Sequence, residues 1–334
     1  MLKKLAPHVA KLAGTITLAS ALLFSASSAA NDWSEAEREF IAQMQSEHQI
    51  PAERTEALLR QAQKSQPILD AIARPWEARP WHQYYPIFLT ERRLRQGIEF
   101  WNKHEETLAR AEQQFGVPAE IIVAVFGVET FYGNVMGTHR VLDALYTLGF
   151  HYPPRQTFFR SELRQFILLA TEEDIDPTSI KGSYAGAMGY GQFISSSYRH
   201  YAVDFDGDGV RDLMGNVVDG IGSIANYFAE HRWQANQPIT VPAWVSQSTN
   251  VSELTSGRGQ VLTHTIGELK EAGVRFITAM PDDTRARLFA FEEADGSHSY
   301  WVGLPNFYAI TRYNHSPLYA MAVFQLAEQL RAHR

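Results

Sequence analysis

The sequence contains no cysteine among its 334 residues. This absence excludes disulfides, catalytic thiolates and zinc sites built from thiolate ligands. It also leaves no thiol to which a lipid could be attached. Any chemistry that the chain performs must therefore come from carboxylates, hydroxyls, imidazoles or bound ligands.

Positive charge is also scarce, because 30 Lys and Arg stand against 37 Asp and Glu, giving a formal net charge of −7. A nucleic-acid binder needs a basic footprint, and adhesion to anionic lipid needs clustered cations. The apolar run near the N-terminus, residues 12–24, is shorter than the roughly 20 residues of a membrane-spanning helix. We therefore expect no nucleic-acid partner and no membrane anchor.

The N-terminus has the organisation of a secretory signal peptide. A short basic start precedes the apolar run, and a row of serines and alanines follows it. This order predicts a signal peptide over residues 1–30, cleaved near Ala29 or Ala30. An anchor that is never cleaved is the alternative. The mature chain, 31–334, is then expected to be a soluble periplasmic protein.

Hydrophobic periodicity predicts helices over most of the mature chain. Ser34, with Glu37 three residues later, has the capping-box pattern of a helix start. Thr90 is a candidate N-cap for one helix that continues to Phe115 and ends at Gly116. The pattern therefore favours a mainly α fold, with a helical body that begins near the signal peptide.

The residue pattern changes from helix-like to strand-like in the segment 239–303, which we interpret as a small α+β insertion near the C-terminus. Asp295 and Gly296 form a hairpin-turn signal between two runs that are typical of strands. The strands are expected at 241–245, 287–293 and 298–302, with a short helix at 266–272. The fold class is therefore α+β, with helices in the majority.

Glu129 is the candidate catalytic residue. It follows the nearly all-apolar stretch 119–128, which predicts a buried helix. Burial and the partial negative charge of a helix C-terminus both raise the pKa of a carboxyl group. A carboxyl that stays protonated near neutral pH can protonate a glycosidic oxygen. A structural carboxylate that caps a neighbouring element is the alternative.

An acidic stretch predicts a structural calcium site. Residues 204–209 read Asp-Phe-Asp-Gly-Asp-Gly, which matches the first six positions of a calcium-binding loop, and Val210 would add its carbonyl. The twelfth position is Gly215 instead of glutamate, so Asp219, or else Asp212, must supply the last ligand. A solvated acidic turn is the alternative. The expected ligands are Asp204, Asp206, Asp208, Val210 and Asp219.

A passage rich in glycine and aromatic residues, 182–193, is the third signal. Glycines let a backbone approach a ligand closely, and Tyr184, Tyr190 and Phe193 offer faces on which a sugar can stack. A tight structural turn explains the same pattern. The sequence lacks nucleotide-binding glycine motifs, a zinc-protease motif and a serine-hydrolase elbow. We therefore expect no cofactor for catalysis.

In order along the chain, these and other segments resemble the lytic murein transglycosylase B family, glycoside hydrolase family 103. The resemblance covers nearly the whole mature chain. The matching segments are Gly-Val-Glu-Thr at 127–130, Leu-Asp-Ala-Leu at 142–145, Lys-Gly-Ser-Tyr-Ala-Gly-Ala-Met-Gly-Tyr-Gly-Gln-Phe at 181–193, Tyr-Ala-Val-Asp-Phe at 201–205, Ala-Asn-Tyr-Phe at 225–228, Leu-Pro-Asn-Phe-Tyr at 304–308 and Arg-Tyr-Asn-His-Ser at 312–316.

The resemblance implies a lysozyme-like fold, with Glu129 as the catalytic glutamate and a calcium loop at 204–219. It also implies a glycan-binding groove, by position in the family pattern. The residues placed there are Tyr84, Arg155, Ser183, Gln192, Tyr227, Tyr313, Asn314 and Tyr319. Two features depart from the family. Pro154 replaces the first of two basic residues that often follow the Tyr-Pro of 152–153, and the lipid-bearing cysteine of well-known members is absent.

The implied activity is that of a lytic transglycosylase. Glu129 would protonate the oxygen between N-acetylmuramic acid (MurNAc) and N-acetylglucosamine (GlcNAc). It would then take the proton of the C6 hydroxyl, which closes a 1,6-anhydro ring. A hydrolysing, lysozyme-type muramidase and a non-catalytic peptidoglycan-binding protein are the alternatives. The expected partners are peptidoglycan glycan strands, and proteins of cell-wall synthesis or remodelling.

Overall fold

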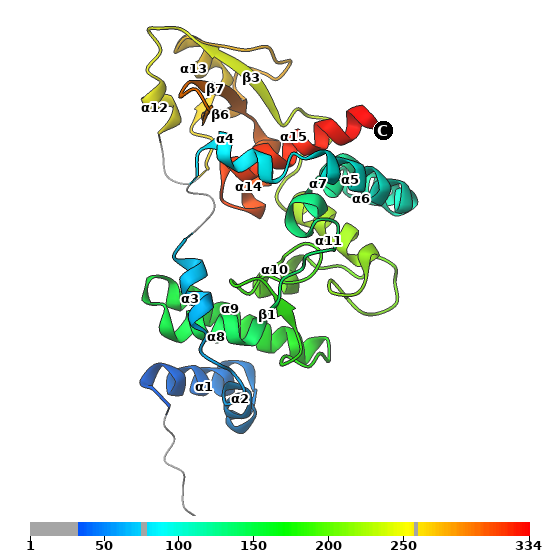
Figure 1. Cartoon of the computed structure of the whole chain (residues 1–334), viewed down its shortest axis with the longest axis vertical. Coiled ribbons are helices and arrows are strands. Elements are labelled where there is room, and N and C mark those ends of the chain that lie inside the picture. Colours follow the sequence, from blue (N-terminus) through cyan, green and yellow to red (C-terminus); the bar gives the residue numbers. More distant parts are fainter. Residues whose placement is uncertain (1–32, 75–78, 257–259) are drawn as a thin grey trace, which may run out of the picture.

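The computed structural model of the chain describes residues 33–74, 79–256 and 260–334 (Figure 1). The expected signal peptide lies outside these residues. The described chain is mainly helical with one small antiparallel sheet, which confirms the expected fold class. Among the described residues, no helix is both long enough and apolar enough to cross a bilayer.

The N-terminal helices pack at one end of the molecule, together with two longer helices from the middle of the chain (Figure 1). Ser34 and Glu37 form the expected capping box, in which the Glu37 carboxylate accepts a hydrogen bond of 2.7 Å from the Ser34 backbone N–H. Glu37 also accepts a 2.6 Å hydrogen bond from the Tyr146 hydroxyl, which ties the first helix to the body. The elements at this end are α1 (Glu35–His48), α2 (Ala52–Leu59), α3 (Gln66–Ile72), α8 (Val141–His151), the 3-10 turn η3 (Pro153–Arg155) and α9 (Gln156–Glu172).

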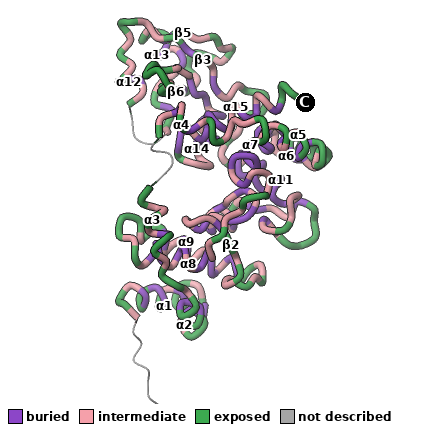
Figure 2. Tube along the Cα trace, in the orientation of Figure 1, coloured by how far each residue is buried: buried purple, intermediate pink, exposed green. Residues whose placement is uncertain are grey.

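The centre of the molecule is built around α7 (Ala119–Thr130), which is buried along nearly its whole length (Figure 2). An all-apolar helix can be buried on every side, and here α5, α6, α11 and α15 pack around it. The surrounding elements are α4 (Trp81–Tyr84), η2 (Tyr85–Ile87), α5 (Glu91–Lys103), α6 (Glu105–Phe115), α10 (Ser195–Tyr201), α11 (Val217–Glu230), α14 (Pro305–Tyr313) and α15 (Pro317–His333).

The prediction of one helix from Thr90 to Phe115 is wrong. Thr90 is the N-cap as expected, and Gly116 ends the segment in the left-handed conformation. The helix is interrupted at His104, whose backbone angles of −116° and 24° are not helical. After the interruption the two helices have different main partners, since α5 packs on α7 and α15 whereas α6 packs chiefly on α11 and also on α7.

The sheet lies between Thr240 and Gly303, in the segment expected to contain strands, and its order is β4-β6-β7-β3-β5 with antiparallel pairs. One face carries Ala243, Leu288 and Val302 in a small core of its own, whereas Phe289 and Phe291 on β6 join the main core. The elements are β3 (Thr240–Val245), α12 (Val251–Thr255), β4 (His264–Thr265), α13 (Ile266–Glu271), β5 (Val274–Arg275), β6 (Arg285–Glu292) and β7 (His298–Gly303). A separate two-stranded ladder joins β1 (His139–Arg140) to β2 (Lys181–Gly182).

Candidate active site

Glu129 lies in the last turn of α7 and is half-buried between the buried Val128 and Thr130. The chain reverses directly after the helix, since Phe131, Tyr132 and Gly133 have φ values of 51°, 60° and 85°. Non-glycine residues rarely adopt this left-handed conformation, and such strain persists only where the surroundings impose it. The turn therefore fixes where the Glu129 side chain emerges from the core.

Side-chain contacts hold this turn from both sides. The Thr130 hydroxyl donates a 3.2 Å hydrogen bond to the Phe126 carbonyl and accepts one of 3.0 Å from the Gly133 N–H. Gly133 lies so close to Tyr190 that a Cβ there would be 2.6 Å from the Tyr190 ring. Glycine is therefore required at this position by its φ angle and by the available space.

Two residues that the sequence analysis missed stabilise this turn, namely Tyr132, which belongs to it, and Arg93 on α5. The Tyr132 hydroxyl fills a slot between α5 and α7, where a Cβ on Gly97 or Gly127 would collide with it. Arg93 donates a 3.0 Å hydrogen bond to the Gly127 carbonyl, and its guanidinium lies 4.9 Å from the centre of the Phe131 ring. Only the packing of α5 on α7 reveals these contacts, because the residues are far apart in the sequence.

Tyrosines face the Glu129 carboxyl group. The buried Tyr319 lies in the first turn of α15, close enough to Glu129 for the charge of that carboxylate to act on its hydroxyl group. Burial, followed by the charge of Glu129, raises the pKa of Tyr313 and of Tyr319 well above the usual value of a phenol. Both hydroxyls therefore stay protonated at neutral pH and act as hydrogen-bond donors.

The tyrosines form a continuous aromatic row. Tyr313 stacks on Tyr319, with ring centres 6.3 Å apart and planes 7° from parallel, and the Tyr227 ring lies 4.7 Å from Tyr313. The Tyr227 hydroxyl donates to the Arg312 carbonyl at 2.6 Å. Tyr84 on α4 is a further neighbour of Tyr319. An ionised Tyr84 would raise the pKa of Tyr319 through the repulsion of like charges. The structure thus gathers tyrosines from four helices beside Glu129.

The glycine-rich passage supports this row. The Tyr313 hydroxyl donates a 2.6 Å hydrogen bond to the Gly191 carbonyl. Ser183 Oγ accepts hydrogen bonds from two backbone N–H groups, at 3.2 and 3.1 Å. Gln192 has a φ of 49°, and its side-chain Nε2 donates to the Gly189 carbonyl at 3.0 Å. The passage is therefore a tight structural turn, as the alternative interpretation held. It also positions the Tyr313 side chain, whose hydroxyl donates to it.

Arg155 and Asn314 are less closely tied to Glu129. Arg155 is exposed on η3, and its guanidinium lies 4.4 Å from the centre of the Phe158 ring. Asn314 follows Tyr313 directly and is half-buried, with its carbonyl accepting a 2.7 Å hydrogen bond from the Ser316 N–H. Asn314 therefore sits beside the tyrosine row, whereas the contacts of Arg155 are with its own segment.

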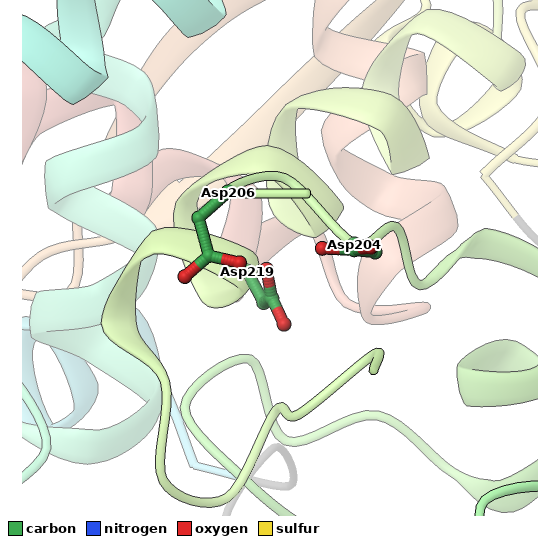
Figure 3. A group of neighbouring side chains, drawn as sticks. All are labelled: Asp204, Asp206 and Asp219. Atoms are coloured by element: carbon green, nitrogen blue, oxygen red, sulfur yellow. The ribbon is translucent and has the colours of Figure 1, made fainter. Parts of the chain in front are cut away.

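The acidic loop gathers three carboxylates (Figure 3). One oxygen from each of Asp204, Asp206 and Asp219 lies within 4.8 Å of the others. Asp219 is buried in the first turn of α11 and accepts hydrogen bonds from the Phe205 and Asp212 N–H groups, at 2.7 and 2.8 Å. Burial, followed by the charges of Asp206 and Asp204, raises the pKa of Asp219. Clustered carboxylate oxygens are the ligands that calcium prefers.

The other predicted ligands have different surroundings. The Asp208 carboxylate accepts a 2.8 Å hydrogen bond from the Val210 N–H and is not part of the group of three. Val210 is 45% exposed. The Asp212 carboxylate caps the following turn by accepting from the Met214 and Gly215 N–H groups at 2.9 and 2.8 Å. The geometry thus favours Asp219 over Asp212 as the additional carboxylate.

A hydrogen-bonded path joins the acidic loop to the catalytic turn. The Thr130 hydroxyl lies 3.3 Å from the Tyr190 carbonyl, to which it donates. The Tyr190 N–H donates to the Leu213 carbonyl at 2.9 Å, and the neighbouring Asp212 N–H donates to Asp219. The two sites are therefore parts of one packed unit.

Comparisons with known proteins agree with this geometry. Residues 32–328 match the family described as "Transglycosylase SLT domain". Over 301 residues the chain is 42% identical to the membrane-bound lytic murein transglycosylase B of Escherichia coli (strain K12), covering 87% of this chain and 81% of that protein. The X-ray structure of catenated lytic transglycosylase SltB1 from Pseudomonas aeruginosa is 48% identical, with a TM-score of 0.85 over 90% of this chain and 99% of that one.

A second solved structure, Escherichia coli lytic transglycosylase Slt35 in complex with calcium, is 41% identical, with a TM-score of 0.79 over 90% of this chain and 94% of that one. The family resemblance and the lysozyme-like fold expected from the sequence are thereby confirmed. The chain belongs to the transglycosylase SLT domain family and is a lytic transglycosylase.

Proposed function

We propose that Glu129 is the acid and then the base with which this enzyme cleaves the MurNAc-β-1,4-GlcNAc bond of peptidoglycan. The observation that carries the proposal is the position of Glu129, at the end of a buried helix and beside the protonated Tyr313 and Tyr319. Murein, which is peptidoglycan, is the substrate in the name of the Escherichia coli relative. The chemistry of a single carboxyl group fits a reaction that needs no water.

In the first step, Glu129 donates its proton to the oxygen that links the two sugars. The bond from MurNAc C1 to this oxygen breaks, GlcNAc leaves as an alcohol, and C1 acquires oxocarbenium character. Glu129 is then a carboxylate, which the Tyr319 hydroxyl stabilises by donating a hydrogen bond. The N-acetyl group of MurNAc would assist at C1, and the Ser183 hydroxyl, which accepts two backbone hydrogen bonds, would orient that group by donating its proton.

In the second step, the Glu129 carboxylate removes the proton from the C6 hydroxyl of the same MurNAc. The C6 oxygen forms a bond to C1 and closes the 1,6-anhydro ring, and Glu129 regains the proton that it gave. An intramolecular nucleophile has an effective concentration of about 10⁵ M or more when it is well oriented, so it can outcompete water. The enzyme is therefore restored without consuming water.

The glycan strand would lie along the tyrosine row. The tyrosine rings would contact the sugars, and the hydroxyls of Tyr227 and Tyr313 can accept hydrogen bonds from them while donating to backbone carbonyls. The amides of Gln192 and Asn314 can both donate and accept. Arg155 would face the acidic peptide stem, where Pro154 leaves it without a basic neighbour. We propose the complete set as Tyr84, Arg155, Ser183, Gln192, Tyr227, Tyr313, Asn314 and Tyr319.

We also propose a structural calcium ion at the acidic loop. The close approach of Asp204, Asp206 and the buried Asp219 fits a divalent cation, which would neutralise their mutual repulsion. Asp208 and the Val210 carbonyl are the proposed further ligands. A relative solved in complex with calcium supports this assignment. The ion would order the loop and take no part in bond cleavage.

We propose that the protein acts in the periplasm, where its substrate is. The support is the signal-peptide pattern of residues 1–30. Fractionation of cells that produce the full chain should recover the processed protein in the periplasmic extract. Recovery of the unprocessed chain in the cytoplasm would contradict the proposal.

The decisive test is Glu129→Gln, with Glu120→Gln on the same helix as the matched control. Glutamine keeps the shape of glutamate but neither donates the acid proton nor removes the second one. Each proton transfer is worth about 10²–10⁴ in rate, so turnover of purified sacculi should fall by at least ~10⁴. Glu120→Gln, in the first turn of α7, should keep most of the activity.

Mass spectrometry of the products tests the second step separately. The wild-type products should end in 1,6-anhydroMurNAc and be lighter by one water than hydrolysis products. Retained activity in Glu129→Gln would overturn the residue assignment. Reducing-end MurNAc from the wild type would leave Glu129 as the acid but make the enzyme a hydrolysing muramidase.

A further inference from the structure

A groove whose lining includes neither Glu129 nor the tyrosine row runs between the sheet and α15. It consists of two adjoining cavities of about 430 and 500 Å³, which share Pro242 and Trp301 in their walls. One cavity extends over the β3–β7 ribbon to Trp244, and the other extends to the polar side of α15. In Figure 1 these elements lie at the sheet end of the molecule, where α15 passes beneath the strands.

The strand side of this groove is an aromatic platform. Pro242 on β3 pairs with Trp301 on β7, so both side chains lie on one face of the sheet. Trp244 is two residues along β3 and therefore projects from the same face, where it is 62% exposed. The Trp301 ring packs edge-on against Phe324 of α15, with centres 6.0 Å apart. Exposed apolar surface that is rimmed by polar residues often marks a ligand-binding groove.

The helix side of the groove is polar but has little net charge. Gln325, Glu328 and Gln329 are spaced three and four residues apart, so they share one face of α15. The Glu328 carboxylate pairs with the Arg331 guanidinium at 2.7 Å, which offsets its charge. The groove thus offers two neutral amides opposite aromatic rings.

This combination selects a particular class of ligand. Nucleic acid and anionic lipid need clustered cations, which these walls lack. A sugar ring presents an apolar C–H face that stacks on an indole and hydroxyl groups that pair with amides. We propose that the groove is a second glycan-binding site, which holds GlcNAc-containing, uncharged stretches of a peptidoglycan strand. The inference rests on the proposed function, because it takes the enzyme's substrate as the ligand.

The groove and the catalytic residues share α15. Tyr319 points into the core beside Glu129, whereas Gln325 and Gln329 lie on the surface of the same helix. Ten residues separate Tyr319 from Gln329, which corresponds to roughly 15 Å along the helix axis. A strand held in the groove would keep neighbouring glycan close to Glu129, and so raise its effective concentration without any new contact at the reacting bond.

Binding is best measured in a Glu129→Gln background, where the glycan stays intact. The probes are purified sacculi in a sedimentation assay and a soluble chito-oligosaccharide in calorimetry. Trp244→Ala should weaken binding of both by about tenfold, as expected for a lost aromatic stacking surface. Trp244→Phe keeps a ring and should retain most of the affinity, whereas Trp244→Leu keeps apolar area without a ring and should behave like alanine.

A second pair of substitutions tests the helix wall. Gln325→Ala with Gln329→Ala should also weaken binding, and alanine is a good helix former, so α15 should stay intact. In the active enzyme, Trp244→Ala should raise the half-saturating amount of sacculi much more than the KM for a short glycan fragment. A thermal melt checks that each variant is folded.

The inference is overturned if Trp244→Ala binds as well as its parent, if leucine supports binding as well as phenylalanine, or if the parent does not bind the chito-oligosaccharide. These results are separable from a failure of the proposed function. Retained cleavage by Glu129→Gln would overturn the catalytic assignment, whereas the affinity differences at Trp244 report on the groove alone.

Discussion

The two carboxylate sites of the molecule are built on opposite principles. Glu129 is a single carboxyl group in a largely apolar setting, and its neighbours are protonated tyrosines. The acidic loop instead brings Asp204, Asp206 and Asp219 within 4.8 Å, so their charges repel one another. The comparison teaches that Glu129 is surrounded mainly by aromatic side chains, whereas the mutual repulsion of the three aspartates is of the kind that a bound cation relieves.

Removing calcium should have the largest effect on stability. A ligand at about a hundredfold excess over its Kd stabilises the folded state by about 2.7 kcal/mol, so a chelator should lower the melting temperature by several degrees. Asp206→Asn should reduce the difference between calcium and chelator. Asp176→Asn, at an exposed turn elsewhere, is the control. A melting curve that is the same in calcium and in chelator would show that the acidic loop does not need a cation to balance its charges.

Tyr319→Phe should have the next largest effect, and on activity instead of stability. The variant keeps the ring that stacks on Tyr313 but removes the hydroxyl that faces Glu129. Hydrogen bonds to charged groups are worth about 1.5–3 kcal/mol, so turnover of sacculi should fall about tenfold to a hundredfold. Tyr308→Phe, on α14, is the control. Equal turnover in the two variants would remove Tyr319 from the site.

Arg93→Lys should slow the reaction several-fold without weakening substrate binding. Lysine cannot both donate to the Gly127 carbonyl and lie flat over Phe131, so the turn after Glu129 should loosen. Because Arg93 positions Glu129 through other residues, kcat should change while KM stays nearly constant. Arg95→Lys, on the same helix, is the control. A change in KM alone would place Arg93 in substrate binding.

The smallest expected effect concerns three partly buried histidines, of which His231 stacks on Tyr227 with ring centres 4.1 Å apart. Burial lowers the pKa of His104, His151 and His231 in the folded protein. The unfolded chain therefore binds more protons below pH ~6.5, and stability should fall as the pH drops from 7 towards 5. His231→Gln should flatten this dependence by of the order of 1 kcal/mol or less, as measured by denaturant unfolding at both pH values. His333→Gln is the control. If neither variant changes how the free energy of unfolding depends on pH, groups other than His231 cause that dependence.

Local patterns in the sequence predicted those features that depend on neighbouring residues. The capping box at Ser34 and the left-handed end at Gly116 follow from backbone needs within a few residues, and the structure confirms both. The apolar run before Glu129 predicted a buried helix, which α7 is. The roles of Glu129 and of the predicted glycan-binding residues stay predictions until the variants are measured.

Features that depend on packing between distant segments were not predicted. The interruption at His104 follows from the different partners of α5 and α6, which periodicity alone does not show. Arg93 and Tyr132 look like ordinary helix and turn residues until α5 is packed on α7. The sequence included Asp219 among the expected ligands of the acidic loop, but the spacing did not show that the Asp208 carboxylate turns to the Val210 N–H and stays apart from the other three carboxylates.

The slot that receives Tyr132 limits how this protein can evolve. A Cβ on Gly127 would lie 2.6 Å from the Tyr132 hydroxyl, and one on Gly97 would collide with the same atom. A Cβ on Gly97 would also lie 2.6 Å from Leu330, and one on Gly127 would lie 3.0 Å from Leu326, so α15 closes the slot from the other side. A smaller residue at 132 would relieve the collision at Gly127 more than the one at Gly97. In a complete substitution scan, these positions should therefore depend on one another, and Gly97 should also depend on residue 330.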